Sequence, residues 1–329
     1  MFEKLQNSIK RIVKCAAIFF AVASIIGCGK KDYGNEFTTA PLSDGGYEIE
    51  EVVLECPEIS GEYNLLVVAD LHLISINDEV LPQSIDEVKA RISNFRKEGK
   101  GLSSAKRWKK LPTYINNCNS DMVLFAGDMV DFASKENIDL LKTGIDEIIN
   151  APILYARADH DISPFYMTSM SQTAYNECLD RQMEVSHYAD AFYEDLGEIV
   201  VLVINNSTGQ VTDSGLLVVK EAIEIGKPIV LLTHVPIDSM IDDSLRKMSG
   251  AMFAGRNLTW GLETEYYRPE DTTKEFLNLV YAEDSLIKEI VCGHLHFEWD
   301  GYITENTHEH VYSPAFDGKI GLLRIRGQK

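Results

Sequence analysis

Aspartate and histidine side chains follow five apolar runs of the sequence at the point where each run ends. They are Asp70 and His72, Asp128 and Asp131, Asp159 and His160, His234, and His294 with His296. Carboxylate oxygens and imidazole nitrogens are the ligands that zinc, manganese and iron accept in proteins. In extended backbone, residues two apart point to the same side, so Asp70 and His72 can share one cation. These residue types and spacings predict a metal centre.

The runs that precede these residues are typical of strands buried on both faces. They cover residues 64–69, 122–126, 153–156, 199–204, 228–233 and 287–292, and helical patterns lie between them at 84–98, 104–118, 134–149 and 214–226. Continuous apolar runs of this length suit the strands of an α/β sheet. Ligands bind outside the carboxyl ends of such strands, so the five motifs are expected to converge on one pocket.

The converging groups are numerous enough for two cations. The candidate ligands are Asp70, His72, Asp128, Asp159, His234, His294 and His296. Without a metal, the clustered carboxylates would repel one another and their burial would be costly. One shared aspartate would give a binuclear centre of zinc, manganese or iron.

The sequence after residue 296 has a different texture. Short strand-like pieces at 299–303, 310–312 and 320–325 follow one another with little helix, which predicts a second, more antiparallel sheet. His308 and His310 are expected on the surface of these strands, and Trp108 is expected in the core.

The N-terminus has the layout of an export signal. Four basic residues precede an apolar run over residues 15–26, which is too short to favour a permanent transmembrane helix. The run ends at Ile25-Ile26-Gly27-Cys28, which resembles the lipobox of bacterial lipoproteins. We therefore expect residues 1–27 to be a lipoprotein signal peptide, Cys28 the lipid attachment site, 28–46 a flexible tether and 47–329 the folded domain. An extracytoplasmic protein anchored to the bacterial cell membrane is predicted; an ordinary signal peptide or an uncleaved anchor is the alternative.

Charge limits the classes of partner. The formal net charge of −20 argues against nucleic-acid binding, which needs a basic surface. Between Lys89 and Lys110, however, nine Lys or Arg residues accompany a single Glu98. This basic segment has two interpretations: attraction of an anionic substrate or lipid headgroup, or an ordinary solvated helix face.

Two polar segments interrupt the α/β rhythm, near 162–189 and 237–272, and are interpreted as insertions, either functional or surface padding. In the second, Trp260, Tyr266 and Tyr267 offer stacking surfaces for a base or sugar.

Cys56, Cys118, Cys178 and Cys292 permit three disulfide pairings or none, and the sequence does not choose between them.

In order, Asp-Leu-His, Gly-Asp-Met-Val-Asp, Ala-Asp-His-Asp, Thr-His-Val-Pro and Gly-His-Leu-His resemble the motifs of the calcineurin-like metallophosphoesterases, over about residues 62–326. The resemblance implies a four-layer α/β/β/α sandwich of two mixed sheets flanked by helices. It implies that one metal takes Asp70, His72, Asp128 and His296, and that the other shares Asp128 and adds Asp159, His234 and His294. A metal-bridging hydroxide would attack phosphorus, with His160 as general acid. Asp131 would orient His160 or form a turn.

One position departs from the family pattern. The family usually has Gly-Asn-His-Asp or Gly-Asn-His-Glu, where this chain has Ala158-Asp159-His160-Asp161. Asp159 therefore replaces a neutral amide ligand with a carboxylate, which lowers the charge of the site by one and changes its attraction for metal and for phosphate.

The resemblance implies a phosphomonoesterase or phosphodiesterase acting on a phosphorylated small molecule or lipid-linked substrate. A pyrophosphatase acting on nucleotide-sugar or lipid-linked diphosphates is one alternative. A non-catalytic metal-binding lipoprotein that recognises a phosphorylated ligand is another, although the presence of His160 speaks against it. The sequence leaves the natural substrate, the metal identity and the oligomeric state open.

Overall fold

The computed structural model describes the chain except residues 1–45, 81–83, 165–170, 188, 207 and 328–329. The expected signal peptide, Cys28 and nearly all of the tether lie outside the described residues. Within the part that is described, no helix is both long and apolar enough to cross a membrane.

The first sheet has five strands in the order β1-β11-β2-β3-β4. Their bounds are Glu48–Glu55, Lys319–Arg326, Glu62–Val68, Met122–Phe125 and Ile153–Tyr155. Only the β11–β2 pair is antiparallel, with Leu322 opposite Leu66, so the sheet is mixed. The carboxyl ends of β2, β3 and β4 therefore lie at the same edge, as the motif positions require.

The second sheet has six strands in the order β5-β6-β7-β8-β10-β9. Their bounds are Ala191–Asp195, Val200–Ile204, Ile229–Leu232, Ile287–Cys292, His308–Val311 and Trp299–Tyr302. The four inner strands, β6, β7, β8 and β10, run parallel to one another. The two edge strands, β5 and β9, run antiparallel to their neighbours. This sheet supplies the ends of β7 and β8 to the site.

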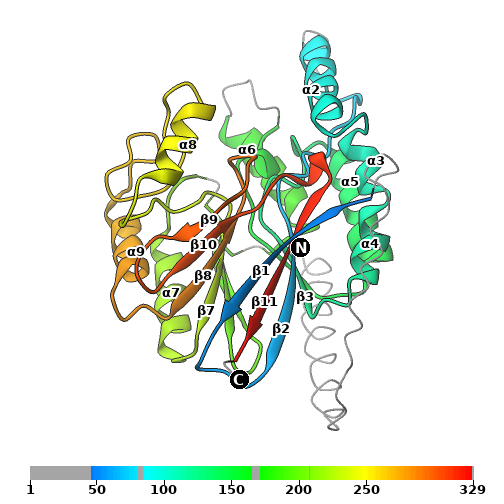
Figure 1. The fold of residues 1–329 in the computed structure, drawn as a ribbon. Helices are drawn as coiled ribbons and strands as arrows, with labels where there is room; N and C mark the ends of the chain where they lie inside the picture. Colours follow the sequence, from blue (N-terminus) through cyan, green and yellow to red (C-terminus); the bar gives the residue numbers. More distant parts are fainter. Residues whose placement is uncertain (1–45, 81–83, 165–170, 188, 207, 328–329) are drawn as a thin grey trace, which may run out of the picture. The chain divides into compact units, whose positions relative to one another are not determined.

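Helices cover the outer faces of both sheets (Figure 1). Beside the first sheet lie α2 (Ile85–Glu98), α3 (Ser104–Trp108), α4 (Leu111–Asn117), α5 (Lys135–Thr143) and a π-helical turn, Gly144–Ile148. Beside the second lie α7 (Asp213–Glu224) and α9 (Asp271–Tyr281). The inner faces share one apolar core that includes Leu65 and Leu124 from the first sheet and Val201 and Leu232 from the second. The predicted four-layer α/β/β/α sandwich is confirmed.

The helix expected over 104–118 is two helices, α3 and α4. The break falls at Lys109 and Lys110, and Pro112 sits in the first turn of α4. Proline has no backbone N–H to donate to the preceding turn and is tolerated only where a helix begins. The two insertions contribute α6 (Gln172–Gln182) and α8 (Ser244–Met252).

The second, more antiparallel sheet expected after residue 296 is only partly correct. β9 and β10 extend the second sheet, whereas β11 lies inside the first, between β1 and β2. The physical reason is that β11 is buried on both faces. Four consecutive residues of this strand, Ile320, Gly321, Leu322 and Leu323, are all buried, which suits a central strand and not an edge strand with one face exposed to solvent.

Three further expectations are resolved by burial. Trp108 is in the core as predicted, at 4% exposure. His310 is only 2% exposed, so its expected place on the surface is wrong. Trp260 is fully buried and packs on Phe276 with the ring centroids 5.3 Å apart, so it cannot stack on a ligand. The four cysteines named above are buried free thiols.

Candidate metal centre

The ligand candidates converge because of unusual backbone geometry. Five of them have left-handed φ angles: Asp70 (49°), His72 (44°), Asp128 (52°), His294 (73°) and His296 (54°). Side chains other than glycine rarely adopt this region, although Asp and His do so more readily than most, and such strain collects at functional sites. The expectation that Asp70 and His72 share a side through extended backbone is therefore wrong; left-handed turns beyond β2 aim them at one point.

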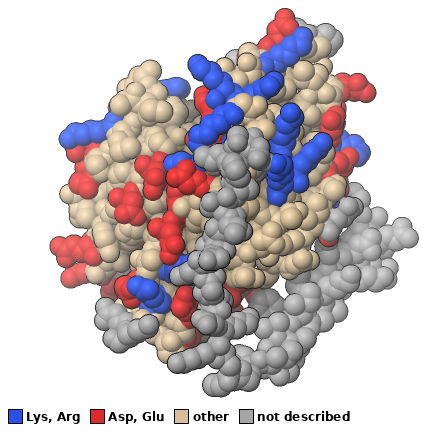
Figure 2. Space-filling model, turned by 45° about the vertical axis from the view of Figure 1, so that its right-hand side comes forward, with Lys and Arg blue, Asp and Glu red and all other residues tan. Residues whose placement is uncertain are grey.

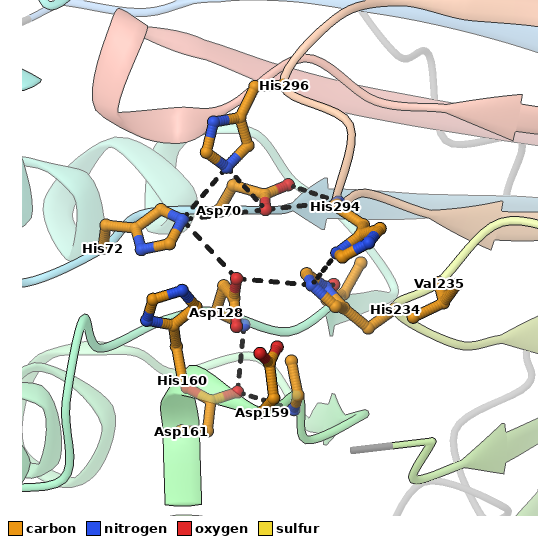
Figure 3. A network of polar contacts seen from close by, with 12 residues as sticks. Asp70, His72, Asp128, Asp159, His160, Asp161, His234, Val235, His294 and His296 are labelled. Atoms are coloured by element: carbon orange, nitrogen blue, oxygen red, sulfur yellow. Dashed lines mark hydrogen bonds and ion pairs between the residues drawn. The ribbon is translucent and has the colours of Figure 1, made fainter. Parts of the chain in front are cut away.

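Three side chains from the two sheets form the first cluster. Asp70, His72 and His296 offer ligand atoms that all lie within 4.8 Å of one another. His296 Nε2 is 3.1 Å from His72 Nε2 and 3.3 Å from Asp70 Oδ1 (Figure 3). Asp70 and His72 are completely buried or nearly so, at 0% and 1% exposure. Their geometry fits one cation.

Asp128 lies between this cluster and a second one (Figure 3). Its Oδ2 is 3.5 Å from His72 Nε2 and 3.3 Å from His234 Nε2. His294 Nδ1 is in turn 3.2 Å from His234 Nε2. Asp128 Oδ1 is buried and has no hydrogen-bond partner among the described residues. A carboxylate placed in this way suits a ligand shared by two cations.

The hydrogen bonds of the imidazoles fix which nitrogens face the site. His72 Nδ1 donates to Asp131 Oδ1 at 2.9 Å, and His234 Nδ1 donates to the carbonyl of Ala126 at 2.8 Å. Because those acceptors cannot donate, each Nδ1 carries a proton, and Nε2 is the nitrogen directed toward the other ligands. This arrangement, in which the second ring nitrogen donates to a carboxylate or carbonyl, is the one metal-bound histidines adopt. The residues present therefore fit a pair of metal ions.

The electrostatics agree with a need for positive charge. Burial opposes protonation of His234, but the nearby Asp128 and Asp70 carboxylates outweigh it and raise its pKa to about 10. Burial and the charge of His234 lower the pKa of His294 to about 3. The metal-free site thus holds a proton on His234 that a cation must displace, and metal affinity is expected to rise with pH.

Asp159 stands at the edge of this arrangement. Its side chain is exposed, it lines the same cavity as the other ligands, and Figure 3 places it on the side of Asp128 and His234. Among the described residues, no cluster of tightly spaced ligand atoms includes it. The structure therefore places Asp159 in the cavity of the other ligand candidates but outside their close groups.

His160 and Asp131 lie next to one another and to His72. His160 Nδ1 donates to the backbone carbonyl of Asp131 at 2.9 Å, while the Asp131 carboxylate is 3.7 Å away. That carboxylate instead accepts from His72 and from Arg91, whose Nε lies 2.8 Å from Oδ2. Asp131 thus orients the metal ligand His72 through its side chain and His160 through its backbone.

Sequence reasoning missed two supporting residues. Asp161 is fully buried and accepts from the backbone amides of Asp128, Val130 and Ala158 and from the Tyr155 hydroxyl. Tyr267, in the second insertion, is 3.1 Å from His294 Nε2. The sequence could have indicated Asp161, because it is the last residue of the Ala-Asp-His-Asp motif. It could not have indicated the contact of Tyr267 with His294, because Tyr267 lies in a loop that belongs to no motif.

Gly127 tests how closely this centre is packed. A Cβ added there would lie 2.4 Å from His234 Nδ1, and its φ is +85°. Gly127→Ala is therefore expected to displace the His234 ring and weaken one metal site at least about tenfold, since misplaced ligand support typically costs that much. Metal titration followed by elemental analysis measures this.

Gly226→Ala is the matched control, because Gly226 also has a positive φ (+76°) but no atom within 4 Å of an added Cβ. It should cost only about 1 kcal/mol of backbone strain and leave metal binding unchanged. Equal metal affinity in the two variants would contradict the packing argument.

The site opens into a cavity of about 320 Å³. Beside the ligands it is lined by Arg91, Asn94, Phe95 and Glu98 of α2 and by Phe253 and Leu258 of the second insertion.

The basic segment between Lys89 and Lys110 contains a buried arginine with a structural role and a set of exposed cations. Arg107 is fully buried and donates to the carbonyls of Gly46, Gly99, Phe316 and Asp317.

The remaining cations of the segment form a basic face over α2–α4, visible in Figure 2. Its exposed residues are Lys89, Arg96, Lys97, Lys100, Lys106, Lys109 and Lys110. Helix α2 carries part of this face and also lines the cavity, to which it contributes Arg91, Asn94, Phe95 and Glu98.

A sandwich of two mixed sheets with paired metal positions at the strand ends defines the class of binuclear metallohydrolases. The family model for the calcineurin-like phosphoesterases matches residues 63–298, well over half of the chain. The chain belongs to this family and is a metallophosphoesterase that uses two metal ions. No curated protein shows significant sequence similarity to it.

Several solved structures resemble the chain at low identity. A dimetal phosphatase from Danio rerio is 9% identical with a TM-score of 0.47, covering 78% of this chain and 88% of its own. A purple acid phosphatase from yellow lupin seeds is 14% identical with a TM-score of 0.43, covering 82% and 44%. A phosphopantetheinyl hydrolase from Mycobacterium tuberculosis is 13% identical with a TM-score of 0.35, covering 78% and 90%. Their substrates carry no information about the substrate of this chain.

Proposed function

We propose that this metallophosphoesterase hydrolyses a phosphate ester with His160 as the proton donor to the leaving oxygen, outside the cytoplasmic membrane. The observation that carries the proposal is the position of His160. It lines the cavity beside Asp128, and its ring is anchored at Nδ1 by a hydrogen bond to the Asp131 carbonyl.

Two cations, when bound, would supply an activated water and neutralise charge on the phosphoryl oxygens. The chain contributes the rest. The residues that would hold the cations around Asp128 are Asp70, His72 and His296 on one side and His234, His294 and Asp159 on the other. Phe95 stacks on His72 with the ring centroids 4.9 Å apart and keeps this ring in place.

The protonation state of His160 suits a general acid. Burial lowers its pKa, but the carboxylates of Asp128, Asp159 and Asp131 outweigh burial and raise the pKa to about 9. Before metal binds, His160 is therefore protonated at neutral pH. In the metal-loaded enzyme, the rate is expected to fall as pH rises past the pKa that His160 has there.

Asp159→Asn tests this link. The substitution removes one of the carboxylates that favour protonated His160, so its pKa falls and the alkaline limb of the pH–rate profile moves to lower pH. Steady-state rates between pH 6 and 10 at saturating metal measure it. Asp180→Asn, which changes an exposed carboxylate outside the cavity, is the control. An unchanged alkaline limb in Asp159→Asn would show that the Asp159 carboxylate does not raise the pKa of His160.

The substrate is proposed to be a phosphorylated small molecule or a lipid-linked phosphate. Support comes from the lipobox-like segment ending at Cys28 and from the basic face over α2–α4. Exposed positive charge attracts a small anion, and it attracts anionic headgroups equally well.

Assays with generic phosphomonoesters, phosphodiesters and diphosphates in Mn or Zn identify the reaction. Turnover of a monoester or diester supports the proposal, and preferential cleavage of diphosphates replaces it with a pyrophosphatase. Binding of phosphate without any turnover replaces it with a phosphate-recognising protein. For the location, Cys28→Ala is expected to move the protein from the membrane fraction to the soluble one.

A further inference from the structure

A second group of metal-type side chains lies where the two sheets meet, and it shares no residue with the centre described above. Glu50 belongs to β1 of the first sheet, His310 belongs to β10 of the second, and Glu298 directly precedes β9. Each offers a ligand atom within 4.8 Å of the other two. Glu50 and His310 are buried, at 8% and 2% exposure, while Glu298 is exposed.

The hydrogen bonds of His310 leave one nitrogen for a cation. Its Nδ1 lies 2.9 Å from Asp300 Oδ1, so Nδ1 carries the proton and donates to that carboxylate. Its Nε2 is buried and has no hydrogen-bond partner among the described residues. A carboxylate on one ring nitrogen and a free lone pair on the other is the arrangement of a metal-bound histidine.

The surroundings of this nitrogen contain acceptors in excess. Glu50 Oε2 accepts from the amide of Ser313 at 3.0 Å, and Glu50 Oε1 accepts from Lys319 Nζ at 2.9 Å. Neither donor reaches His310. Carboxylates cannot donate to a lone pair, so neither glutamate satisfies the buried Nε2, whereas a cation would.

We propose that Glu50, Glu298 and His310 bind one divalent transition-metal ion, such as zinc, in addition to the catalytic pair. One imidazole and two carboxylates suit zinc or manganese; calcium and magnesium prefer oxygen ligands alone. Lys319, whose side chain is 25% exposed, turns outward when the ion binds. The ion then replaces the single charge of the ammonium with two.

The site joins two parts of the molecule that matter for the catalytic centre. It links β1 of one sheet to β10 of the other, and Glu298 lies two residues after His296. An ion held by Glu298 therefore restrains the segment that carries His296. Its role is structural positioning, since none of its ligands lines the catalytic cavity.

The stoichiometry of zinc binding tests the proposal. Full-length protein is loaded with zinc, passed through a desalting column and analysed for metal; titration against a chelator of known affinity gives the individual constants. Wild type is expected to bind one more equivalent than Glu298→Gln, whose third constant should weaken about tenfold or more. Because Glu298 is exposed and the amide is isosteric, this variant is expected to fold.

Two further variants sharpen the result. Glu305→Gln changes an exposed glutamate between β9 and β10 by the same charge and should keep the third equivalent. Lys319→Met removes the competing ammonium and should tighten the third site. Saturation of wild type at two equivalents, or equal stoichiometry in Glu298→Gln and Glu305→Gln, overturns the proposal and leaves His310 as a hydrogen-bond partner of Asp300.

Discussion

Asp128→Asn is expected to lower kcat/KM by about 10³-fold or more and to reduce bound metal below two equivalents. Asp128 Oδ2 lies within 3.5 Å of His72 Nε2 and within 3.3 Å of His234 Nε2, so one carboxylate serves both metal positions. An amide offers one neutral oxygen in its place. Loss of several kcal/mol of charge stabilisation corresponds to a rate change of this size.

Steady-state kinetics and elemental analysis of the same preparations check this expectation. Asp284→Asn, at an exposed aspartate outside the cavity, changes the net charge equally and should behave as wild type. A variant of Asp128 that retained two equivalents and normal rates would show that the two metal positions do not depend on a shared ligand.

His160→Asn should lower kcat by about 10²- to 10⁴-fold while both metal ions remain bound, because general acids contribute on that scale. The loss should be greater for an alkyl phosphate than for an aryl phosphate with an acidic phenol. An acidic phenol can leave as the phenolate without being protonated. An alkoxide is a poor leaving group and must be protonated as it departs. The alkaline limb of the pH–rate profile should also disappear.

Comparison of the two esters in wild type and variant gives the readout, and His187→Asn, at an exposed histidine outside the cavity, serves as control. Equal losses for both esters would assign His160 to binding of the phosphoryl group and not to protonation of the leaving oxygen. Loss of metal in the variant would instead make His160 a ligand, which its proximity to His72 and Asp128 makes a real alternative.

The sequence predicted those parts of the fold that follow from local pattern. The strand at 287–292 has the expected bounds, and buried strands such as β2 and β7 were recognisable because both of their faces are apolar. The partner of β11 was not predictable in this way. An apolar run indicates burial but does not say which sheet buries it, and β11 crosses to the sheet that begins with β1.

The same distinction applies to the site. Residue type and position at strand ends predicted the ligand candidates, because Asp and His have few other reasons to follow five apolar runs. The convergence itself depends on left-handed backbone at residues such as Asp70 and His294, which no periodicity encodes. Contacts across loops, such as Tyr267 on His294 or Arg91 on Asp131, depend on tertiary packing alone.

The place of β11 has a consequence for the order in which the chain acquires its structure. Among the described strands, β1 pairs only with β11. In the sheet, β11 lies between β1 and β2. During synthesis β1 and β2 emerge first, yet their sheet cannot close until residues 319–326 have followed. Even the turn that holds Asp70 waits, since its carbonyl accepts from the amide of Phe316. Such long-range pairing folds slowly. The first sheet of a nascent chain therefore stays incomplete until nearly all of the protein has been made.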